Sequence, residues 1–271
     1  MLTSDPRLLG DAEVKNQMMM AFAALLGMVD VASAATCGNT STGFDAWKMK
    51  FAKEAKGKAS ADAINALLET TYATGTIAAD RGQKNFLLSF EQFMAKRGAN
   101  AIIARGRALK KSQSALFASI EQRYGVPPGP LLAIWGMETG FGAVMGNQNT
   151  LSAVATLAYD CRRSAMFTQH LYAALTLIDR GVMTADSRGA MHGEIGHTQF
   201  LPKNVLLYGT GNLENSADAL KSTANFLKGH GWRAGAGYQP GEPNFSALQG
   251  WNAAGVYQRA LAAIGQQIDD N

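Results

Sequence analysis

Residues 131–142 read LLAIWGMETGFG, the most informative segment of the chain. Pro130 suits the first turn of a helix, and Gly140 is placed to end it. The positions at i, i+3, i+4 and i+7 are Leu131, Ile134, Trp135 and Glu138. Because these positions share one face of a helix, the Glu138 carboxyl group is predicted to lie on the apolar face and not on the solvent face.

A carboxyl group next to an indole on an apolar face is poorly solvated. Desolvation disfavours the charged form, so the pKa of Glu138 is expected to be raised. A raised pKa is what a general acid needs near neutral pH. The alternative is a structural Glu138 paired with an arginine, and spacing alone does not decide between the two.

Helical periodicity dominates the chain, and it predicts a mainly α-helical protein. Stripes of aromatic residues at helical spacing, such as Phe44, Trp47 and Phe51, predict core packing rather than a binding surface. Candidate N-cap residues are Ser60, Ser112 and Ser114. In the second half, helices are expected at residues 131–139, 150–160, 164–180, 216–229 and 252–268. The stretches 182–213 and 230–250 are predicted to be irregular, and no run of alternating strands appears.

Residues 1–34 have the layout of a secretory signal peptide. Lys15 precedes a short apolar run from Met18 to Val29, and Ala32-Ser33-Ala34 forms an A-x-A cleavage site. The run is too short to span a bilayer comfortably, so no stable membrane span is expected after cleavage. The alternative is a buried helix of a cytoplasmic protein. The sequence therefore predicts export to the periplasm.

The charge of the mature chain favours an anionic partner. Removing residues 1–34 leaves 23 basic and 17 acidic side chains, a net charge of +6. Nucleic acid fits poorly, because no cluster of Lys and Arg alternates with aromatic residues. The cell wall, with its peptide carboxylates, fits at least as well.

Two cysteines, Cys37 and Cys161, are the number that one disulfide needs in an exported protein. The alternative is two free thiols. No spacing of His and Cys resembles a zinc site. His192 and His197 are interpreted as polar loop residues, because two histidines without a third ligand rarely hold a metal.

Two further segments carry polar groups that suit a glycan. Residues 189–202, GAMHGEIGHTQFLP, combine glycines with Glu194, Gln199 and Phe200. The amide of Gln199 suits N-acetyl and hydroxyl groups of a sugar. Phe200 is interpreted as a structural residue rather than a sugar-binding one. Residues 250–260, GWNAAGVYQRA, contain Asn252 and Tyr257, and the alternative for this tyrosine is a core residue with a satisfied hydroxyl group.

Together these segments resemble the lytic murein transglycosylases, specifically the membrane-bound lytic transglycosylase B type. The matching pieces are AIWGMETGFG (133–142), NTLSAVATLAYDCRRSAMF (149–167), GEIGHTQFLP (193–202), STANFLKGHGW (222–232) and WNAAGVYQRA (251–260). The resemblance implies a lysozyme-like catalytic domain at 126–271, with an N-terminal helical extension at 35–125 packing on it. The expected form is a periplasmic monomer without a cofactor.

The resemblance also implies a reaction on peptidoglycan glycan strands. Glu138 would be the single essential carboxyl group, protonating the glycosidic oxygen between N-acetylmuramic acid and N-acetylglucosamine. As a carboxylate it would then take the proton of the muramic C6 hydroxyl group, which closes on C1 to give a 1,6-anhydro product. This departs from the two-carboxylate scheme of ordinary glycosidases.

Substrate contacts are carried over from the resemblance residue by residue. Gln199 would lie near the scissile sugars, and Asn252 and Tyr257 would contact the N-acetyl region. Arg162 and Arg163 would suit muropeptide carboxylates. The alternative for the two arginines is a solvated helix start.

The chain departs from its relatives at residues 208–220, YGTGNLENSADAL, which lack the spaced oxygen ligands of a calcium loop. No metal is expected there. Two other functions remain open on the sequence. One is a hydrolytic muramidase in which Glu138 is the acid and Glu194 activates water. The other is a non-catalytic protein that binds peptidoglycan.

Overall fold

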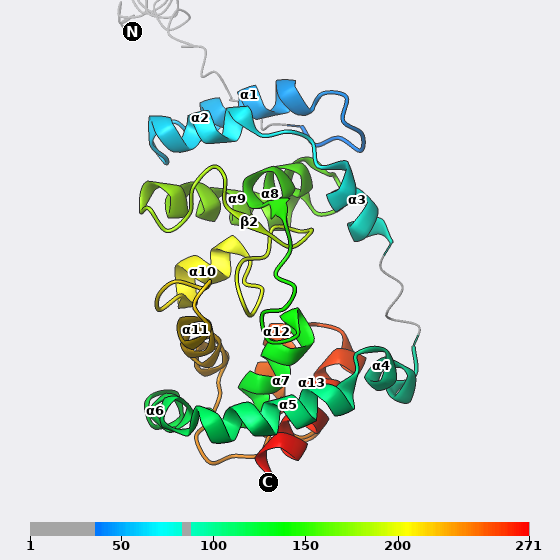
Figure 1. Cartoon of the computed structure of the whole chain (residues 1–271). Helices are drawn as coiled ribbons and strands as arrows, with labels where there is room; N and C mark the ends of the chain where they lie inside the picture. The colour runs from blue at the N-terminus through cyan, green and yellow to red at the C-terminus, as the bar shows by residue number, and fades with distance from the viewer. Residues whose placement is uncertain (1–35, 83–87, 271) are drawn as a thin grey trace, which may run out of the picture. The chain divides into compact units, whose positions relative to one another are not determined.

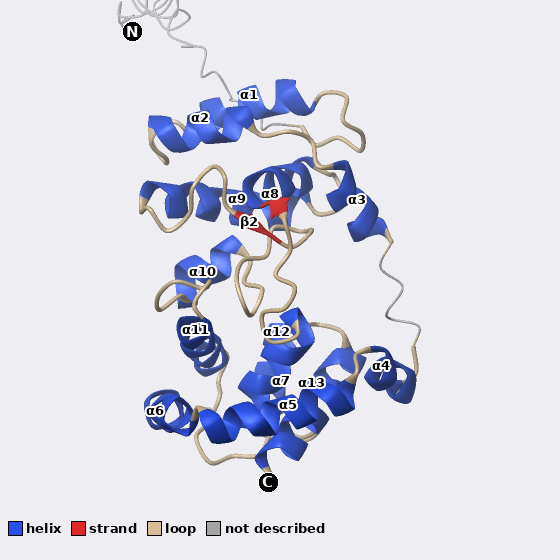
Figure 2. Cartoon of the chain, in the orientation of Figure 1, coloured by secondary structure: helices blue, strands red, loops and turns tan. Residues whose placement is uncertain are grey.

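The computed structural model describes residues 36–82 and 88–270 of the chain (Figure 1). The predicted signal peptide at residues 1–34 lies outside the described residues. The described part is largely helical, with one short two-stranded ladder, as Figure 2 shows. The predicted mainly α class is therefore confirmed. None of the described helices combines the length and the apolar character needed to cross a membrane.

The described residues form thirteen helices and two strands. In chain order the helices are α1 (Phe44–Ala55), α2 (Ala61–Glu69), α3 (Thr74–Arg81), α4 (Phe90–Lys96), α5 (Ala99–Ser112), α6 (Ser114–Tyr124), α7 (Pro128–Thr139), α8 (Thr150–Tyr159), α9 (Ser164–Asp179), α10 (Pro202–Tyr208), α11 (Ser216–Gly229), α12 (Phe245–Trp251) and α13 (Gly255–Asp269). The strands β1 (Gln148–Asn149) and β2 (Arg188–Gly189) pair antiparallel, with Gln148 opposite Gly189.

The five helices predicted in the second half are present as α7, α8, α9, α11 and α13. Two stretches predicted to be irregular each contain a seven-residue helix, α10 and α12. Both predictions were wrong at these points for the same reason. A helix of two turns is too short for its periodicity to stand out among glycines and prolines. Pro202 occupies the first turn of α10, where its missing N–H costs nothing.

The N-cap predictions had mixed outcomes. The side chain of Ser60 accepts a hydrogen bond from the backbone N–H of Ala63, 3.1 Å away, and caps α2 as predicted. Ser112 and Ser114 do not cap α6. Its N-cap is Gln113, which makes no side-chain capping bond, because Ser112 still belongs to the last turn of α5.

Helix α7 is the centre of one packing group. It packs against α5 and α13, and residues Leu131 to Ile134 are fully buried. A helix that is apolar on all sides belongs in a core. Gly129 lets α7 approach α13 closely, because a Cβ atom there would clash with the carbonyl oxygen of Gly265. Glu138 therefore sits near the end of a largely buried helix.

A second packing group forms around α8 and α9, which pack against each other (Figure 1). Helix α2 packs on both of them, and α1 and α3 pack on α8. An aromatic cluster joins the layers, with the ring centroid of Phe44 5.5 Å from Tyr72 and 5.5 Å from Tyr159. Each such pair adds about 0.5–1.5 kcal/mol beyond its buried area.

The predicted extension at residues 35–125 thus contacts the rest of the chain in two places. Its helices α1, α2 and α3 pack on the α8–α9 pair. Helices α4 and α5 pack on α13, and α5 also packs on α7. Helix α6 packs on α11. The boundary at residues 125 and 126 stays a prediction. The extension is built into both packing groups, so it supports the helix that carries Glu138.

A disulfide joins Cys37 to Cys161, across 124 positions of the sequence. Next to it, the backbone N–H of Gly38 donates to the carbonyl oxygen of Tyr159 at 3.0 Å. The hydroxyl group of Tyr159 donates in turn to the carbonyl oxygen of Thr42 at 2.5 Å. The bridge and these hydrogen bonds attach the segment before α1 to the end of α8.

The paired replacement Cys37→Ser/Cys161→Ser is expected to lower the free energy of unfolding by about 4 kcal/mol, because a bridge that closes a loop of more than a hundred residues strongly restricts the unfolded chain. Urea denaturation of the oxidised protein and of the variant measures the difference. Equal unfolding midpoints, or a mass showing two free thiols in oxidised material, would contradict the expectation.

Candidate active site

The carboxyl group of Glu138 is held by two hydrogen-bond donors from the last two helices. The indole Nε1–H of Trp251, in α12, donates to Glu138 Oε1 at 3.0 Å. The hydroxyl group of Tyr257, in α13, donates to the same oxygen. Tyr257 is 5% exposed, so this donor is buried. No arginine ion-pairs with Glu138 among the described residues, which argues against the structural alternative.

Burial raises the pKa of Glu138, because the charged carboxylate is poorly solvated there. The hydrogen bonds from Tyr257 and Trp251 and the charge of Arg97 lower this pKa, whereas the negative charge of Glu194 raises it. The net result is a pKa of Glu138 above its ordinary value. The pKa of Tyr257 is raised well above its usual range, first by burial and then by the charge of Glu138. The tyrosine therefore stays protonated and remains a donor.

Trp251 is itself fixed by an aromatic cluster. Its ring centroid lies 5.3 Å from that of Phe200 and 5.1 Å from that of Phe226, both nearly edge-on. Phe226 stacks on His230 with a centroid distance of 3.9 Å. Phe200 is 1% exposed, so it supports the indole from behind and presents no platform to a sugar.

Sequence reasoning missed Trp251 and Arg97 as members of the site. The Arg97 guanidinium lies 5.8 Å from the ring centroid of Tyr257 and donates to the carbonyl oxygen of Met137 at 3.4 Å. Trp251 stands directly before Asn252, inside a segment that was already singled out. The indole N–H of a tryptophan beside Asn252 was the signal that could have indicated a hydrogen-bond donor of the site. For Arg97 the sequence offers no comparable signal.

The turn after α7 is attached to the loop at residues 189–202. Thr139 Oγ1 donates to the carbonyl oxygen of His197 at 2.7 Å and accepts from the N–H of Gly142 at 2.9 Å. Trp135 Nε1–H donates to Nδ1 of His197 at 3.1 Å. His197 is thus a polar packing residue, as predicted. These contacts bring the loop that carries Gln199 to the end of α7.

Gln199 has a left-handed backbone, with φ of 57°, which is uncommon for a residue that is not glycine. The backbone of Ile195 and Phe200 pairs around it, with N–H to carbonyl distances of 2.8 and 3.0 Å. The Gln199 side chain donates to the carbonyl oxygens of Gly196 at 2.8 Å and Met145 at 3.4 Å. Strained backbone held by its surroundings is common at binding sites.

A cavity of about 880 Å³ adjoins this loop and is lined in part by Met145, Ile195 and Arg188. Glu138 is not among its lining residues. Asn252, also predicted as a contact, uses its Oδ1 atom locally, to accept from the N–H of Ala254 at 2.9 Å. Its role toward a substrate stays a prediction.

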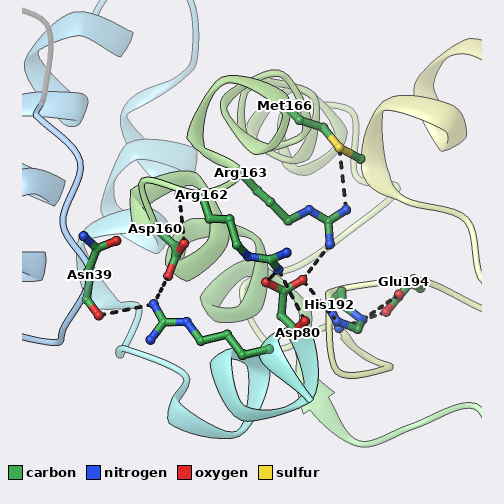
Figure 3. Close-up of polar contacts among 9 residues, drawn as sticks. Asn39, Asp80, Asp160, Arg162, Arg163, Met166, His192 and Glu194 are labelled. Carbon is green, nitrogen blue, oxygen red and sulfur yellow. Dashed lines mark hydrogen bonds and ion pairs between the residues drawn. The ribbon is translucent and has the colours of Figure 1, made fainter. Parts of the chain in front are cut away.

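The structure places Arg162 and Arg163 at a different carboxylate from Glu138. Both ion-pair with the buried Asp80 of α3, and Arg163 Nη1 lies 2.7 Å from Asp80 Oδ1 (Figure 3). Both arginines stand at the start of α9, where they are partly exposed, and their role toward a substrate stays a prediction. Glu194 belongs to the same cluster, where His192 donates to its carboxylate.

Residues 43–241 match the family described as the Transglycosylase SLT domain. The match covers more than half of the chain. The chain belongs to this family. The resemblance inferred from the sequence motifs is thereby confirmed.

A curated relative of this SLT-family chain is membrane-bound lytic murein transglycosylase B of Escherichia coli strain K12. The two are 37% identical over 139 residues, which is 45% of this chain. The match covers 38% of the Escherichia coli protein, well under half its length.

Solved structures share the fold at low sequence identity. SltB3 from Pseudomonas aeruginosa, in complex with NAG-anhNAM-pentapeptide, matches with a TM-score of 0.75 and 23% identity over 83% of this chain and 79% of that one. Escherichia coli Slt35, in complex with calcium, matches with a TM-score of 0.72 and 21% identity over 87% of this chain and 96% of that one. These likenesses confirm the expected lysozyme-like transglycosylase fold.

The oxygen-bearing side chains of region 208–220 in this SLT-family chain make contacts within the protein. Asp218 Oδ2 accepts from the N–H of Asn212 at 3.2 Å, and its Oδ1 lies 3.3 Å from Lys221 Nζ. Asn215 Oδ1 caps α11. Across residues 36–82 and 88–270, no group of three or more His, Cys, Asp or Glu side chains could hold a metal.

Glu138→Gln is expected to raise the unfolding temperature near neutral pH by roughly 2–4 °C. The amide keeps an acceptor for Tyr257 and Trp251 but removes a poorly solvated charge. A carboxyl group with a raised folded-state pKa destabilises the fold only above the ordinary pKa of 4.5, so the gain should disappear in acid. Thermal unfolding, followed by circular dichroism, measures the gain at neutral pH and its loss at acid pH. A lower unfolding temperature at neutral pH would contradict it.

Proposed function

We propose that this chain is a periplasmic lytic transglycosylase of peptidoglycan. It would cleave the β-1,4 bond between N-acetylmuramic acid and N-acetylglucosamine and release a 1,6-anhydro product, with Glu138 as its single acid and base. Membership of the SLT family supports the substrate class. The arrangement of donors around Glu138 supports the chemistry.

The observation that carries the proposal is that both donors reach the same oxygen of Glu138. Trp251 and Tyr257 both donate to Oε1. A neutral carboxyl group carries its proton on one oxygen only, and an oxygen that accepts two hydrogen bonds is the poorer place for it. The acidic proton therefore belongs on Oε2, which is left to face a substrate.

In the proposed reaction Glu138 Oε2 gives its proton to the glycosidic oxygen, and the bond from C1 to that oxygen breaks. The substrate N-acetyl group assists at C1. The Glu138 carboxylate, now stabilised by Tyr257 and Trp251, takes the proton of the muramic C6 hydroxyl group as its oxygen bonds to C1. The carboxyl group is restored and no water is consumed. An internal hydroxyl group replaces the activated water of a hydrolase, so a second carboxylate is not needed.

Gln199, Asn252, Arg162 and Arg163 are proposed to contact the muropeptide around this centre. The cavity beside Met145 is lined by Ile195 of the loop that carries Gln199, although Gln199 itself is not among its lining residues. Pockets of this size suit small ligands and sugar units. We propose the two arginines as the part of the site nearest the stem peptide.

The hydrolytic alternative depends on Glu194 activating a water molecule. Burial raises the pKa of Glu194, but hydrogen bonds and the charge of His192, with backbone N–H groups, outweigh that effect and lower it. Both Glu194 oxygens accept hydrogen bonds from His192, at 2.9 and 3.1 Å. Those bonds stabilise the carboxylate and make it a poor base, which favours the proposal with one carboxyl group.

Glu138→Gln is expected to reduce the release of soluble muropeptides from purified sacculi by about 10³-fold, because one side chain supplies both proton transfers. Mass spectrometry of the wild-type products should show anhydro ends, which lack the elements of one water relative to reducing ends. Reducing ends as the main product would favour the hydrolase. No release by the wild type would favour the non-catalytic protein.

Tyr257→Phe is expected to lower kcat by about tenfold, the equivalent of one charge-assisted hydrogen bond. The lost bond lowers the pKa of Glu138 in the wild type, so its removal raises that pKa further. The protonated acid then persists to higher pH, and the alkaline limb of the pH profile moves upward. Tyr172→Phe, on α9, is the matched control and should leave both values unchanged. A shift of the alkaline limb toward acid would contradict the assignment.

Export is proposed from residues 1–34 and agrees with the Cys37–Cys161 disulfide, since disulfides persist outside the cytoplasm. The mature protein isolated from the periplasm should begin at Ala35. Intact mass and N-terminal sequencing measure this directly. An intact N-terminus on a cytoplasmic protein would rule export out.

A further inference from the structure

Helices α1 and α2 pack against each other and form an outer layer over the α8–α9 pair (Figure 1). A cavity of about 500 Å³ lies between them, and all of its lining residues fall between positions 49 and 68. Most of these residues are exposed, so the cavity is an open groove on the surface of the helix pair. Glu138 is not among its lining residues.

The groove is lined by one stripe of side chains from each helix. Within a stripe the residues follow the i, i+3, i+4, i+7 spacing and so share one helix face. The stripes are Met49, Ala52, Lys53 and Lys56 along α1 and its C-cap, and Ala61, Ile64, Asn65 and Leu68 along α2. Two such stripes, each about two turns long, offer a third helix a place to pack, because helices pack by fitting side-chain ridges into grooves.

The fold leaves the apolar part of this groove open. Met49 is 61% exposed and Leu68 is 39% exposed. The inner faces of the two helices are occupied separately, since Trp47, Phe51 and Leu67 are buried. The groove stripes are therefore not needed for the core. Covering them would stabilise a complex by about 25 cal/mol for each Å² of apolar surface removed from water.

The charged residues that line the groove are both lysines. Lys53 and Lys56 are exposed, and neither ion-pairs with a carboxylate within residues 36–82 and 88–270. Lys56 stands where α1 ends and Lys53 about one turn before it, whereas Met49 begins the stripe. The charge of the groove is complementary to an occupant that carries acidic side chains beside one end of an apolar face.

A second copy of this chain does not supply such an occupant. A two-fold interface offers the same patch from both copies. Because the lining of the groove contains no acidic residue, the lysines of one copy would meet apolar side chains or other lysines.

An anionic bilayer also fits less well than a helix. Residues 44–69 contain five lysines and four acidic residues, a net charge of +1. Lys48 is buried and pairs with Asp45, and the acidic Asp62 and Glu69 are exposed on the same layer. A bilayer is attracted by a broad basic face, whereas here the unpaired lysines and the exposed apolar side chains are gathered in a groove.

We infer that the groove between α1 and α2 docks an amphipathic helix of another protein. The apolar face of that helix packs on Met49, Ile64 and Leu68, and its acidic side chains pair with Lys53 and Lys56. This is the helix-in-groove mode of recognition. The inference goes beyond the proposed reaction and does not depend on it, because the groove shares no residue with the site at Glu138.

The charge preference of the groove is measured by fluorescence anisotropy with two synthetic helical peptides that share one leucine stripe. One peptide carries glutamates beside the stripe and the other carries lysines at the same positions. The protein should bind the acidic peptide about tenfold more tightly, the equivalent of two exposed ion pairs. Lys53→Glu/Lys56→Glu should reverse the preference, which also shows that this variant is folded. Lys111→Glu, an exposed lysine of α5, is the matched control and should keep it.

The natural occupant is identified in cells with a photo-cross-linking residue in place of Leu68. It should join the chain to a segment of another protein in which acidic residues flank a helical apolar stripe, and sequencing of the cross-linked peptide shows this. The same residue in place of Leu207, exposed on α10, should not capture that segment.

Equal affinity of the wild type for both peptides overturns the inference, as does a preference that survives Lys53→Glu/Lys56→Glu. Cross-links from position 68 only to lipid, only to a second copy of this chain, or to nothing overturn it too. Cosedimentation with phosphatidylglycerol vesicles that is lost in Lys53→Glu/Lys56→Glu would assign the groove to a bilayer instead. Dimerisation in analytical ultracentrifugation that is lost in Met49→Gln/Leu68→Gln would assign it to a second copy.

Discussion

A carboxyl group near the end of a largely buried helix is the constraint on which the rest of this structure depends. Helix α7 is apolar on all sides, and Glu138 is its one ionisable side chain. A carboxylate without partners at such a place would cost several kcal/mol. The chain reduces that cost with Tyr257 and Trp251, both donating to one oxygen. Both donors come from the second half of the chain, Trp251 from α12 and Tyr257 from α13.

The helices and the identity of the acid follow from the sequence because both depend on local spacing. Glu138 is recognisable from the i, i+3, i+4, i+7 pattern, and Ser60 from its place before a periodic stretch. Trp251 and Arg97 were not found because their roles depend on which helices pack together. The caps at Ser112 and Ser114 failed for a related reason, since two helices follow each other there almost without a break.

Asp80 gives the clearest case of information that only the three-dimensional structure holds. Nothing in the order of residues connects an aspartate on α3 with arginines eighty positions later. The connection changes the meaning of the arginines, because their charge is already compensated. Motif resemblance suggested a basic pair that binds muropeptide carboxylates, whereas the structure shows both arginines already paired with a buried aspartate of the chain.

The pairing of α7 with α13 has a consequence for how the chain folds. More than a hundred residues separate the two helices, and Tyr257 lies on the second of them. During synthesis α7 has no partner to cover that face until α13 has been made. Contacts this distant in sequence form late and slow the folding of a domain. The packing group around α7 therefore lacks one of its principal helices until α13 has been made, whereas the group around α8 and α9 does not depend on it.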